Sequence, residues 1–277
     1  MSHHIRTSVA LAALPLLLAA CSAAPQGQPV AADCQPKHQI ETLEEGTITV
    51  AVPIQPPYSY QVDGKWVGLD YESLEAIAAL ECLTLNVQSV SYATGLELIQ
   101  TGRVDTAMGG IYRTDERVKI LSMGATVYRE AAALVSFDGY ANLDSLKGAR
   151  VGVVQGYLWN EDLQRELGAD AVTVYQTSDA MYNDLKAKRI DVAVYGTAEA
   201  GYRLQQEPDS GLVVELFEPT EKITATLEPG HVTLPKTLGN DQLTTAFDED
   251  IAELLASGAI AKILEGHNVS GDLAGEG

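Results

Sequence analysis

From residue 46 onward, apolar positions along the chain alternate between a period of two and a period of about 3.6 residues. Residues 47–52 are a β-branched run that predicts a strand. Residues 70–78 repeat apolar side chains at helical spacing, and Asp70 is expected to cap that helix. The pattern continues with a helix at 94–100 and with strands at 83–90 and 104–108.

A second series of the same kind follows residue 144. It predicts strands at 150–154, 171–175 and 190–195, and helices at 160–167, 178–188 and 197–205. Residues 240–265 carry two amphipathic helices without a strand, so these helices must pack on an earlier sheet. The chain is therefore predicted to be α/β, with two units and mainly parallel sheets. Small ligands bind between such units, beyond the carboxyl ends of strands, which here are the loops after Val52, Met108, Val154 and Tyr195.

The N-terminal residues have the plan of a secretory signal. An apolar run from Val9 to Ala20 is shorter than a membrane span, which needs about 20 apolar residues. Leu18-Ala-Ala-Cys21 resembles the lipobox of bacterial lipoproteins. We therefore expect a signal peptide at 1–20, lipidation of Cys21 (palmitate) and a flexible tether at 21–45, so that the mature chain lies outside the cytoplasm on the bacterial membrane. An ordinary signal that leaves Cys21 as a free thiol is the alternative.

Composition narrows the classes of partner. Lys and Arg number 18 against 38 Asp and Glu, and the formal net charge of -20 argues against nucleic acid and against adsorption to an anionic membrane surface. A hydrophobic share of 46% is typical of a globular protein. Tyrosine dominates the aromatic residues, with 12 Tyr beside 3 Phe and 2 Trp.

Cys34 and Cys82 are expected to form a disulfide, because two cysteines remain in an oxidising compartment. A metal site is the weaker interpretation. The sequence has no Cys-x-x-Cys or His-x-x-x-His, and His38, His231 and His267 stand singly. No metal or cofactor is expected.

Five segments in fixed order resemble a known family. They are Gly46-Thr-Ile-Thr-Val-Ala-Val, Pro56-Pro-Tyr-Ser-Tyr, Gly68-Leu-Asp-Tyr-Glu-Ser-Leu-Glu-Ala-Ile-Ala, Gly95-Leu-Glu-Leu-Ile-Gln-Thr-Gly-Arg-Val-Asp and Thr114-Asp-Glu-Arg. The order is similar to that of the family 3 extracytoplasmic solute-binding proteins, which deliver polar amino acids and related compounds to ABC importers.

The resemblance implies a type II periplasmic-binding-protein-like fold, in which two α/β lobes are joined by a two-strand hinge and hold the ligand between them. The chain would cross between lobes near 128–135 and 230–235. A solute-binding domain at 46–268 would then divide into lobe one (46–127 plus 236–268) and lobe two (136–229), followed by a disordered tail at 269–277.

Arg117 ends the Thr-x-x-Arg segment, whose Arg pairs with the ligand carboxylate in this family. A planar guanidinium matches two carboxylate oxygens, which supports the transfer of that role. A surface Arg paired with Asp115 or Glu116 is the alternative. Tyr58 and Tyr92 match positions at which the family places aromatic rings against the ligand, although a packing role is an alternative for each ring.

Three departures from the family pattern fall in the expected cleft. Tyr112 replaces a Thr two residues after Gly110, Tyr157 and Trp159 stand in a loop that usually reads Ser/Thr-Gly-Thr, and Gly196 after Tyr195 replaces the Asp that binds the α-ammonium. Either Glu199 replaces that Asp, or the ligand is not an ordinary α-amino acid. The rings suit a cation, or a flat or apolar group. The expected ligand-binding residues are Tyr58, Tyr92, Gly110, Tyr112, Arg117, Tyr157, Trp159, Tyr195 and Gly196.

These features predict a monomeric binding lipoprotein that captures an amino acid or a related small carboxylate and delivers it to an ABC permease. No catalysis is expected, since the sequence has no Gly-x-Ser-x-Gly and no P-loop. Two alternatives remain. One is an enzyme similar to cyclohexadienyl dehydratases, with Glu199 or Glu130 as the acid, and the other is a ligand sensor.

Overall fold

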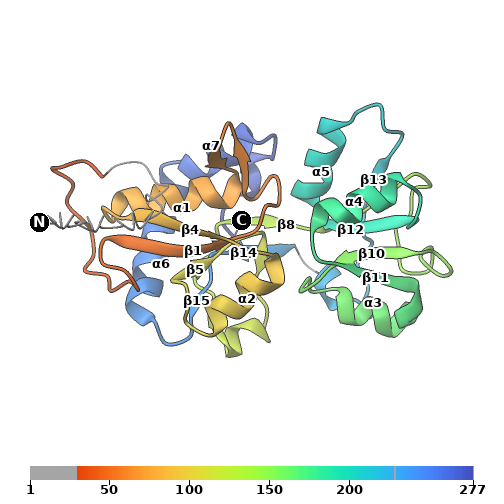
Figure 1. The fold of residues 1–277 in the computed structure, drawn as a ribbon, viewed down its shortest axis with the longest axis horizontal. Coiled ribbons are helices and arrows are strands. Elements are labelled where there is room, and N and C mark those ends of the chain that lie inside the picture. The colour runs from red at the N-terminus through yellow and green to blue at the C-terminus, as the bar shows by residue number, and fades with distance from the viewer. Residues whose placement is uncertain (1–29, 228, 277) are drawn as a thin grey trace, which may run out of the picture.

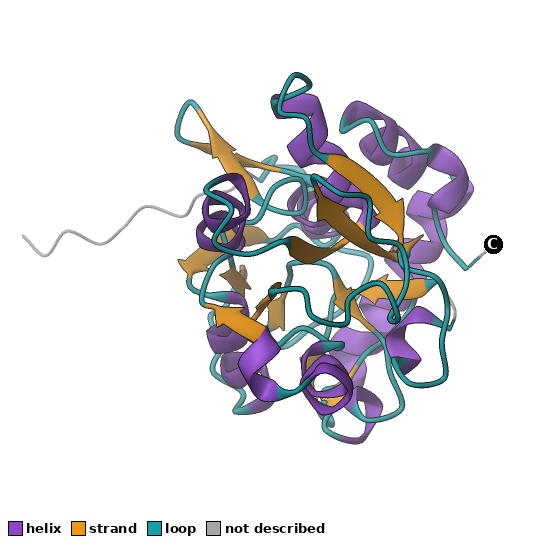
Figure 2. Ribbon diagram, turned by 90° about the vertical axis from the view of Figure 1, so that its right-hand side faces the viewer, coloured by secondary structure: helices purple, strands orange, loops and turns teal. Residues whose placement is uncertain are grey.

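Two five-stranded sheets form two lobes that lie side by side and are joined near β8 (Tyr128–Glu130) and β14 (Gly230–Thr233) (Figure 1). The structure, a computed structural model, describes residues 30–227 and 229–276. Helices surround the strands in the view from the lobe-two end (Figure 2). The predicted α/β fold with two lobes is therefore confirmed. Within the described residues, no helix combines the length and apolar character that crossing a membrane requires.

Lobe one has the strand order β4-β1-β5-β15-β7. The strands β4 (Thr84–Ser89), β1 (Thr47–Val52) and β5 (Thr106–Ala107) are parallel. β15 (Lys236–Thr237) is antiparallel to both of its neighbours, β5 and β7 (Leu121–Ser122), so it alone runs in the opposite direction. Its helices are α1 (Leu69–Leu80), α2 (Tyr92–Gln100), α6 (Asp241–Ala256) and α7 (Ala259–Gly266). The β-branched and apolar residues of β1 are buried from Ile48 to Val52, which makes this strand the centre of the core. Helices α6 and α7 have no sheet of their own and pack against α1.

Lobe two has the strand order β11-β10-β12-β9-β13. The strands β11 (Val172–Tyr175), β10 (Val151–Val154) and β12 (Val192–Gly196) are parallel. β9 (Ala132–Ser136) is antiparallel to both of its neighbours, β12 and β13 (Val213–Leu216), so it alone runs in the opposite direction. The helices of this lobe are α3 (Asn160–Leu167), α4 (Ser178–Lys186) and α5 (Thr197–Gln206). The parallel order β11-β10-β12 brings the carboxyl ends of three strands to one edge.

A small three-stranded sheet lies between the lobes. Its strands are β6 (Ile111–Tyr112), β14 (Gly230–Thr233) and β8 (Tyr128–Glu130), all antiparallel. β8 leads directly into β9 of lobe two, and β14 leads back to β15 of lobe one. The chain therefore crosses between lobes twice, and a relative motion of the lobes must pass through these two strands. A hairpin of β2 (Tyr60–Val62) and β3 (Lys65–Val67) extends lobe one.

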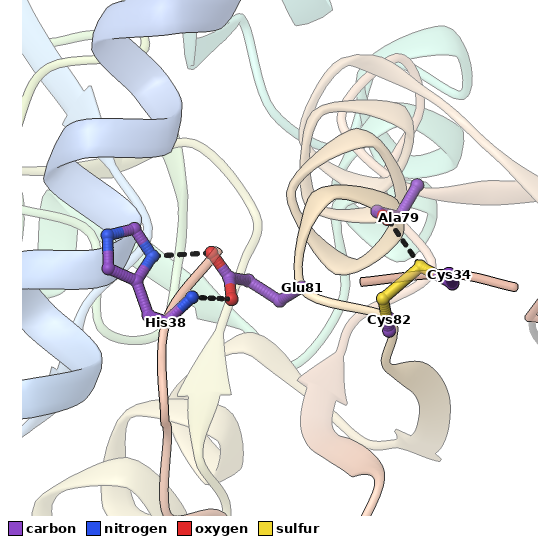
Figure 3. The surroundings of a disulfide bond; sticks show 5 residues. All are labelled: Cys34, His38, Ala79, Glu81 and Cys82. Atoms are coloured by element: carbon purple, nitrogen blue, oxygen red, sulfur yellow. Dashed lines mark hydrogen bonds and ion pairs between the residues drawn. A yellow bond between two sulfur atoms is a disulfide. The ribbon is translucent and has the colours of Figure 1, made fainter. Parts of the chain in front are cut away.

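The segment before β1 is attached to lobe one well before residue 46. The predicted disulfide between Cys34 and Cys82 is present (Figure 3). Beside it, both the backbone N–H and the ring of His38 bond the buried carboxylate of Glu81, at 2.9 and 2.6 Å (Figure 3). Lys37 pairs with Asp250 on α6 at 2.8 Å. Among the described residues the expected tether thus ends near Cys34 rather than at residue 45, because long-range ion pairs anchor a segment that lacks periodicity.

The expected disordered tail is also ordered in its described part. Residues 271–273 form a 3₁₀ turn, Ala274 bridges to Tyr128, and the N–H of Gly275 donates to the carbonyl of Val127 at 2.9 Å. These backbone contacts run along the hinge strand β8. The composition of this segment predicted disorder, because the local sequence does not reveal partners that are distant along the chain.

Candidate ligand-binding site

A cavity lies between the lobes at the hinge. It is lined by Gln55, Tyr58, Tyr92, Gly109, Gly110, Tyr112, Arg117, Glu130, Tyr157, Leu158, Trp159 and Gly196. Most of these residues stand in the loops that follow β1, β5, β10 and β12, which is where parallel sheets place ligands. These are the loops in which the sequence predicted a ligand site.

All of the predicted ligand-binding residues except Tyr195 line this cavity. Tyr195 is fully buried in the core of lobe two, together with Met181 and Ala200. Successive side chains of a strand point to opposite faces, so Tyr195 and Gly196 on β12 cannot both face the cleft. The expectation for Tyr195 was wrong because it treated two neighbouring strand positions as equivalent.

Arg117 is buried at the cavity wall. The backbone N–H of Arg117 donates to the Thr114 hydroxyl at 3.2 Å, which fixes the start of the short 3₁₀ helix at Arg117–Lys119. Its guanidinium donates to the carbonyl of Tyr112 at 2.8 Å, to the Tyr92 hydroxyl at 3.2 Å and to the lobe-two carbonyl of Gly156 at 3.4 Å. Asp115 and Glu116 are not its partners. Arg117 is thus a buried cation whose hydrogen-bond partners among the described residues are neutral.

Aromatic rings from both lobes meet at the cavity. The Tyr157 ring of lobe two stands edge-on to Tyr92 of lobe one and to Trp159, with ring centroids 5.2 and 5.3 Å apart. Tyr112 and Trp159 form a third edge-on pair at 6.4 Å. Gly156 makes the approach of the lobes possible, because its φ is +90° and a Cβ there would lie 3.2 Å from the Tyr92 ring. The indole N–H of Trp159 is buried without an acceptor in the described residues.

The cavity is small. Its volume is about 20 Å³, and one water molecule needs about 10–15 Å³. The rings and loops of the two lobes therefore leave space for about one water molecule at this position. An amino acid requires the lobes or the rings to move apart first.

Polar contacts close the cleft beside the cavity. The Gln55 amide of lobe one donates to the Tyr157 hydroxyl at 2.5 Å and to Glu199 at 3.2 Å. Glu199 is fully buried and also bonds Ser178 and the guanidinium of Arg203. Glu199 thus already has a cationic partner in Arg203, and it is not among the residues that line the cavity.

Glu130 is the acidic group that faces the cavity. It lies on the hinge strand β8, is 4% exposed, and accepts hydrogen bonds from the Tyr58 hydroxyl at 2.9 and 3.0 Å and from the N–H of Ala198 at 3.3 Å. Burial raises the pKa of Glu130 to about 8, and the two donors offset this rise only in part. From the sequence, Glu130 was a candidate only as an enzymatic acid, because a hinge-strand residue gives no local sign that it will face the loop after β12.

A buried carboxylate holds the loop that forms one wall. Asp70 accepts the backbone N–H groups of Gly109 and Gly110, each at 2.8 Å, and the Tyr128 hydroxyl at 2.6 Å. Asp70 was expected to cap α1, but the helix begins one residue earlier, at Leu69, with Gly68 as its N-cap. The carboxylate is therefore free to connect α1, the cavity wall and the hinge.

The remaining predicted features concern other parts of the chain. Cys21 and the signal peptide fall outside the described residues. Three side chains of metal-ligating type, His38, Glu81 and Asp250, lie together in lobe one. They are engaged in the ion pairs that anchor the N-terminal segment.

Two lobes that share a hinge and hold a cavity between them define a two-lobed binding protein for a small solute. Residues 48–269 match the bacterial extracellular solute-binding proteins, family 3, and the chain belongs to this family. It is 26% identical over 246 residues to the lysine/arginine/ornithine-binding periplasmic protein of Escherichia coli K12, covering 84% of this chain and 90% of that protein. It is 28% identical over 229 residues to the L-cystine-binding protein TcyJ of the same strain, covering 80% and 82%. Among solved structures it is similar to an ancestral arginine-binding protein bound to arginine, with a TM-score of 0.71, 25% identity and coverage of 80% and 97%.

Proposed function

We propose that this protein is the substrate-binding lipoprotein of an ABC importer, held outside the cytoplasm by lipid on Cys21. It captures an amino acid or an amino-acid-like carboxylate between its lobes and presents the closed form to a permease. Family membership supports the extracytoplasmic role, and the Leu-Ala-Ala-Cys21 segment supports the anchor.

The observation that carries the proposal is the buried guanidinium of Arg117 in the wall of the inter-lobe cavity. It has no acidic partner among the described residues, and a buried cation gains most from a carboxylate that reaches it. The unpartnered indole N–H of Trp159, from the other lobe, offers a second donor in the same wall. A ligand carboxylate would therefore contact both lobes.

Such a ligand favours the closed form through its higher affinity for that form. The small volume of the cavity implies that the lobes open to admit the ligand and then close again. Tyr157 and Gln55 restore their inter-lobe contact on closure, and the permease then distinguishes closed from open molecules. The step needs no chemistry, so we assign the protein no enzymatic activity.

The relatives narrow the ligand class. Their names include arginine, lysine, ornithine and cystine, each with an α-carboxylate and an α-ammonium group. The aromatic walls of this cavity suit an amino acid with a cationic or flat side chain. We therefore propose that the ligand is a cationic amino acid or cystine.

The test is a thermal-shift panel on the mature domain with L-arginine, L-lysine, L-ornithine, L-cystine and L-glutamine. A ligand that binds only folded protein raises the melting temperature. Arg117→Ala should weaken the best ligand at least 30-fold, about 2 kcal/mol, because a charge-assisted pair is lost in a desolvated site. The control is Arg113→Ala, an exposed Arg four residues earlier. Normal binding by Arg117→Ala would remove the basis of the proposal.

One observation favours a second candidate function. Glu130 keeps its proton at neutral pH inside the cavity, which is what the acid of a cyclohexadienyl dehydratase would require. Incubation with prephenate and arogenate decides the matter. Turnover that is lost in Glu130→Gln would establish an enzyme, and unchanged substrate leaves the binding protein.

A further inference from the structure

The carboxyl group of Glu130 fills the space where a side chain at position 196 would begin. A Cβ placed on Gly196 would lie 2.6 and 2.7 Å from the two carboxyl oxygens of Glu130 and 2.5 Å from the Tyr58 hydroxyl. Any larger residue at 196 would therefore collide with Glu130. The two positions are complementary, because one residue contributes the carboxyl and the other contributes the space for it.

We propose that Glu130, from the hinge strand β8, binds the α-ammonium group of the ligand at the end of β12, where the chain itself has only Gly196. This assignment rests on the proposed function. It makes the ligand a zwitterion, with its carboxylate on Arg117 and its ammonium on Glu130.

Among the described residues, no cation is bonded to Glu130. Its carboxyl oxygens accept hydrogen bonds from the Tyr58 hydroxyl and from the backbone N–H of Ala198. None of the ion pairs within the described residues includes it. The other titratable groups that face it are Asp70 on α1, Tyr112 on β6 and Tyr128 on β8. Arg117 lines the same cavity but is bonded to neutral groups.

Burial without a cation explains why the carboxyl group holds its proton up to about pH 8, with the charge of Asp70 adding to the effect. An arriving ammonium supplies the missing positive charge, so the carboxyl loses its proton as it pairs. In this step, protonated Glu130 and the ammonium ligand form one ion pair, and one proton is released to solvent. Binding below pH 8 is therefore coupled to proton release.

This coupling is measurable without any substitution. Isothermal titration of L-arginine into the mature protein at pH 7, in phosphate and in Tris, gives the proton count from the difference in heats. A group with a pKa of about 8 should release about nine-tenths of a proton per ligand at pH 7, and affinity should rise close to tenfold between pH 6 and 7. If L-lysine, L-ornithine or L-cystine gives the larger thermal shift, that compound replaces L-arginine.

Variants assign the proton to Glu130. Glu130→Gln should release none and bind L-arginine about 100-fold more weakly, whereas it should bind 5-guanidinopentanoate, which lacks the α-ammonium, as the wild type does. Glu215→Gln, an exposed Glu of lobe two, is the matched control. In Glu130→Ala combined with Tyr58→Phe, the added change Gly196→Asp should recover at least tenfold in affinity, because both groups that a Cβ at position 196 would meet have then been removed.

The outcomes separate the two proposals. If no amino acid of the panel binds, the proposed function fails and this inference fails with it. If L-arginine binds with no proton release, or binds equally well to Glu130→Gln, this inference alone is overturned. Equal affinities of the Glu130→Ala, Tyr58→Phe variant with and without Gly196→Asp would also overturn it, provided that both proteins unfold cooperatively.

Discussion

Asp70→Ala should destabilise the protein and loosen one wall of the cavity. The side chain is 1% exposed and accepts three hydrogen bonds, from Gly109, Gly110 and Tyr128. Removing it leaves two backbone N–H groups and one phenol without an acceptor, and each such buried group costs about 1–3 kcal/mol. Part of this loss of stability is offset, because the variant no longer has to bury a carboxylate. That burial is unfavourable in the wild type, as the raised pKa of Asp70 indicates.

We therefore expect Asp70→Ala to lower the free energy of unfolding by about 3 kcal/mol. Urea titration followed by the fluorescence of Trp66 and Trp159 measures this value. Asp70→Asn is the control, because its amide oxygen keeps the acceptor for both glycine N–H groups, and it should lose less than about 1 kcal/mol. A loss below about 1 kcal/mol in Asp70→Ala, or equal losses in both variants, would refute the role of this carboxylate.

Two further predictions concern the disulfide of lobe one and Glu130 of the hinge. Reducing the Cys34–Cys82 bond, which spans 48 residues, should lower the free energy of unfolding by up to about 4 kcal/mol and leave ligand affinity unchanged; an unchanged urea midpoint in dithiothreitol would contradict this. Because the pKa of Glu130 is about 8 folded and ordinary when unfolded, the folded state holds the extra proton. Ligand-free wild type should therefore lose up to about 1.4 kcal/mol per pH unit between pH 5 and 8 relative to Glu130→Gln, and parallel pH profiles of the two proteins would speak against it.

The fold was predictable because its signals are local and repeated. The β-branched run at 47–52 became the buried strand β1, and two series of alternating elements became two lobes. The ends of the chain were less predictable. Lys37 and His38 are anchored by Asp250 and Glu81, which are distant in sequence, so their order has no local sign.

The order of the motifs and the positions of the loops were enough to predict part of the candidate site. Arg117 and most of the aromatic residues line the cavity at the expected loops. The prediction for Tyr195 was wrong, because side chains alternate along a strand and that of Tyr195 points into the core of lobe two. Glu130 was missed in its place beside Gly196, because only the folded hinge brings β8 to the end of β12.

A crystal structure of the mature protein with its best amino-acid ligand tests the central claim most directly. The account predicts one ligand between the lobes, with its carboxylate on the guanidinium of Arg117 and its ammonium within hydrogen-bond distance of Glu130. A ligand bound outside this cavity, or one whose carboxylate makes no contact with Arg117, would contradict it.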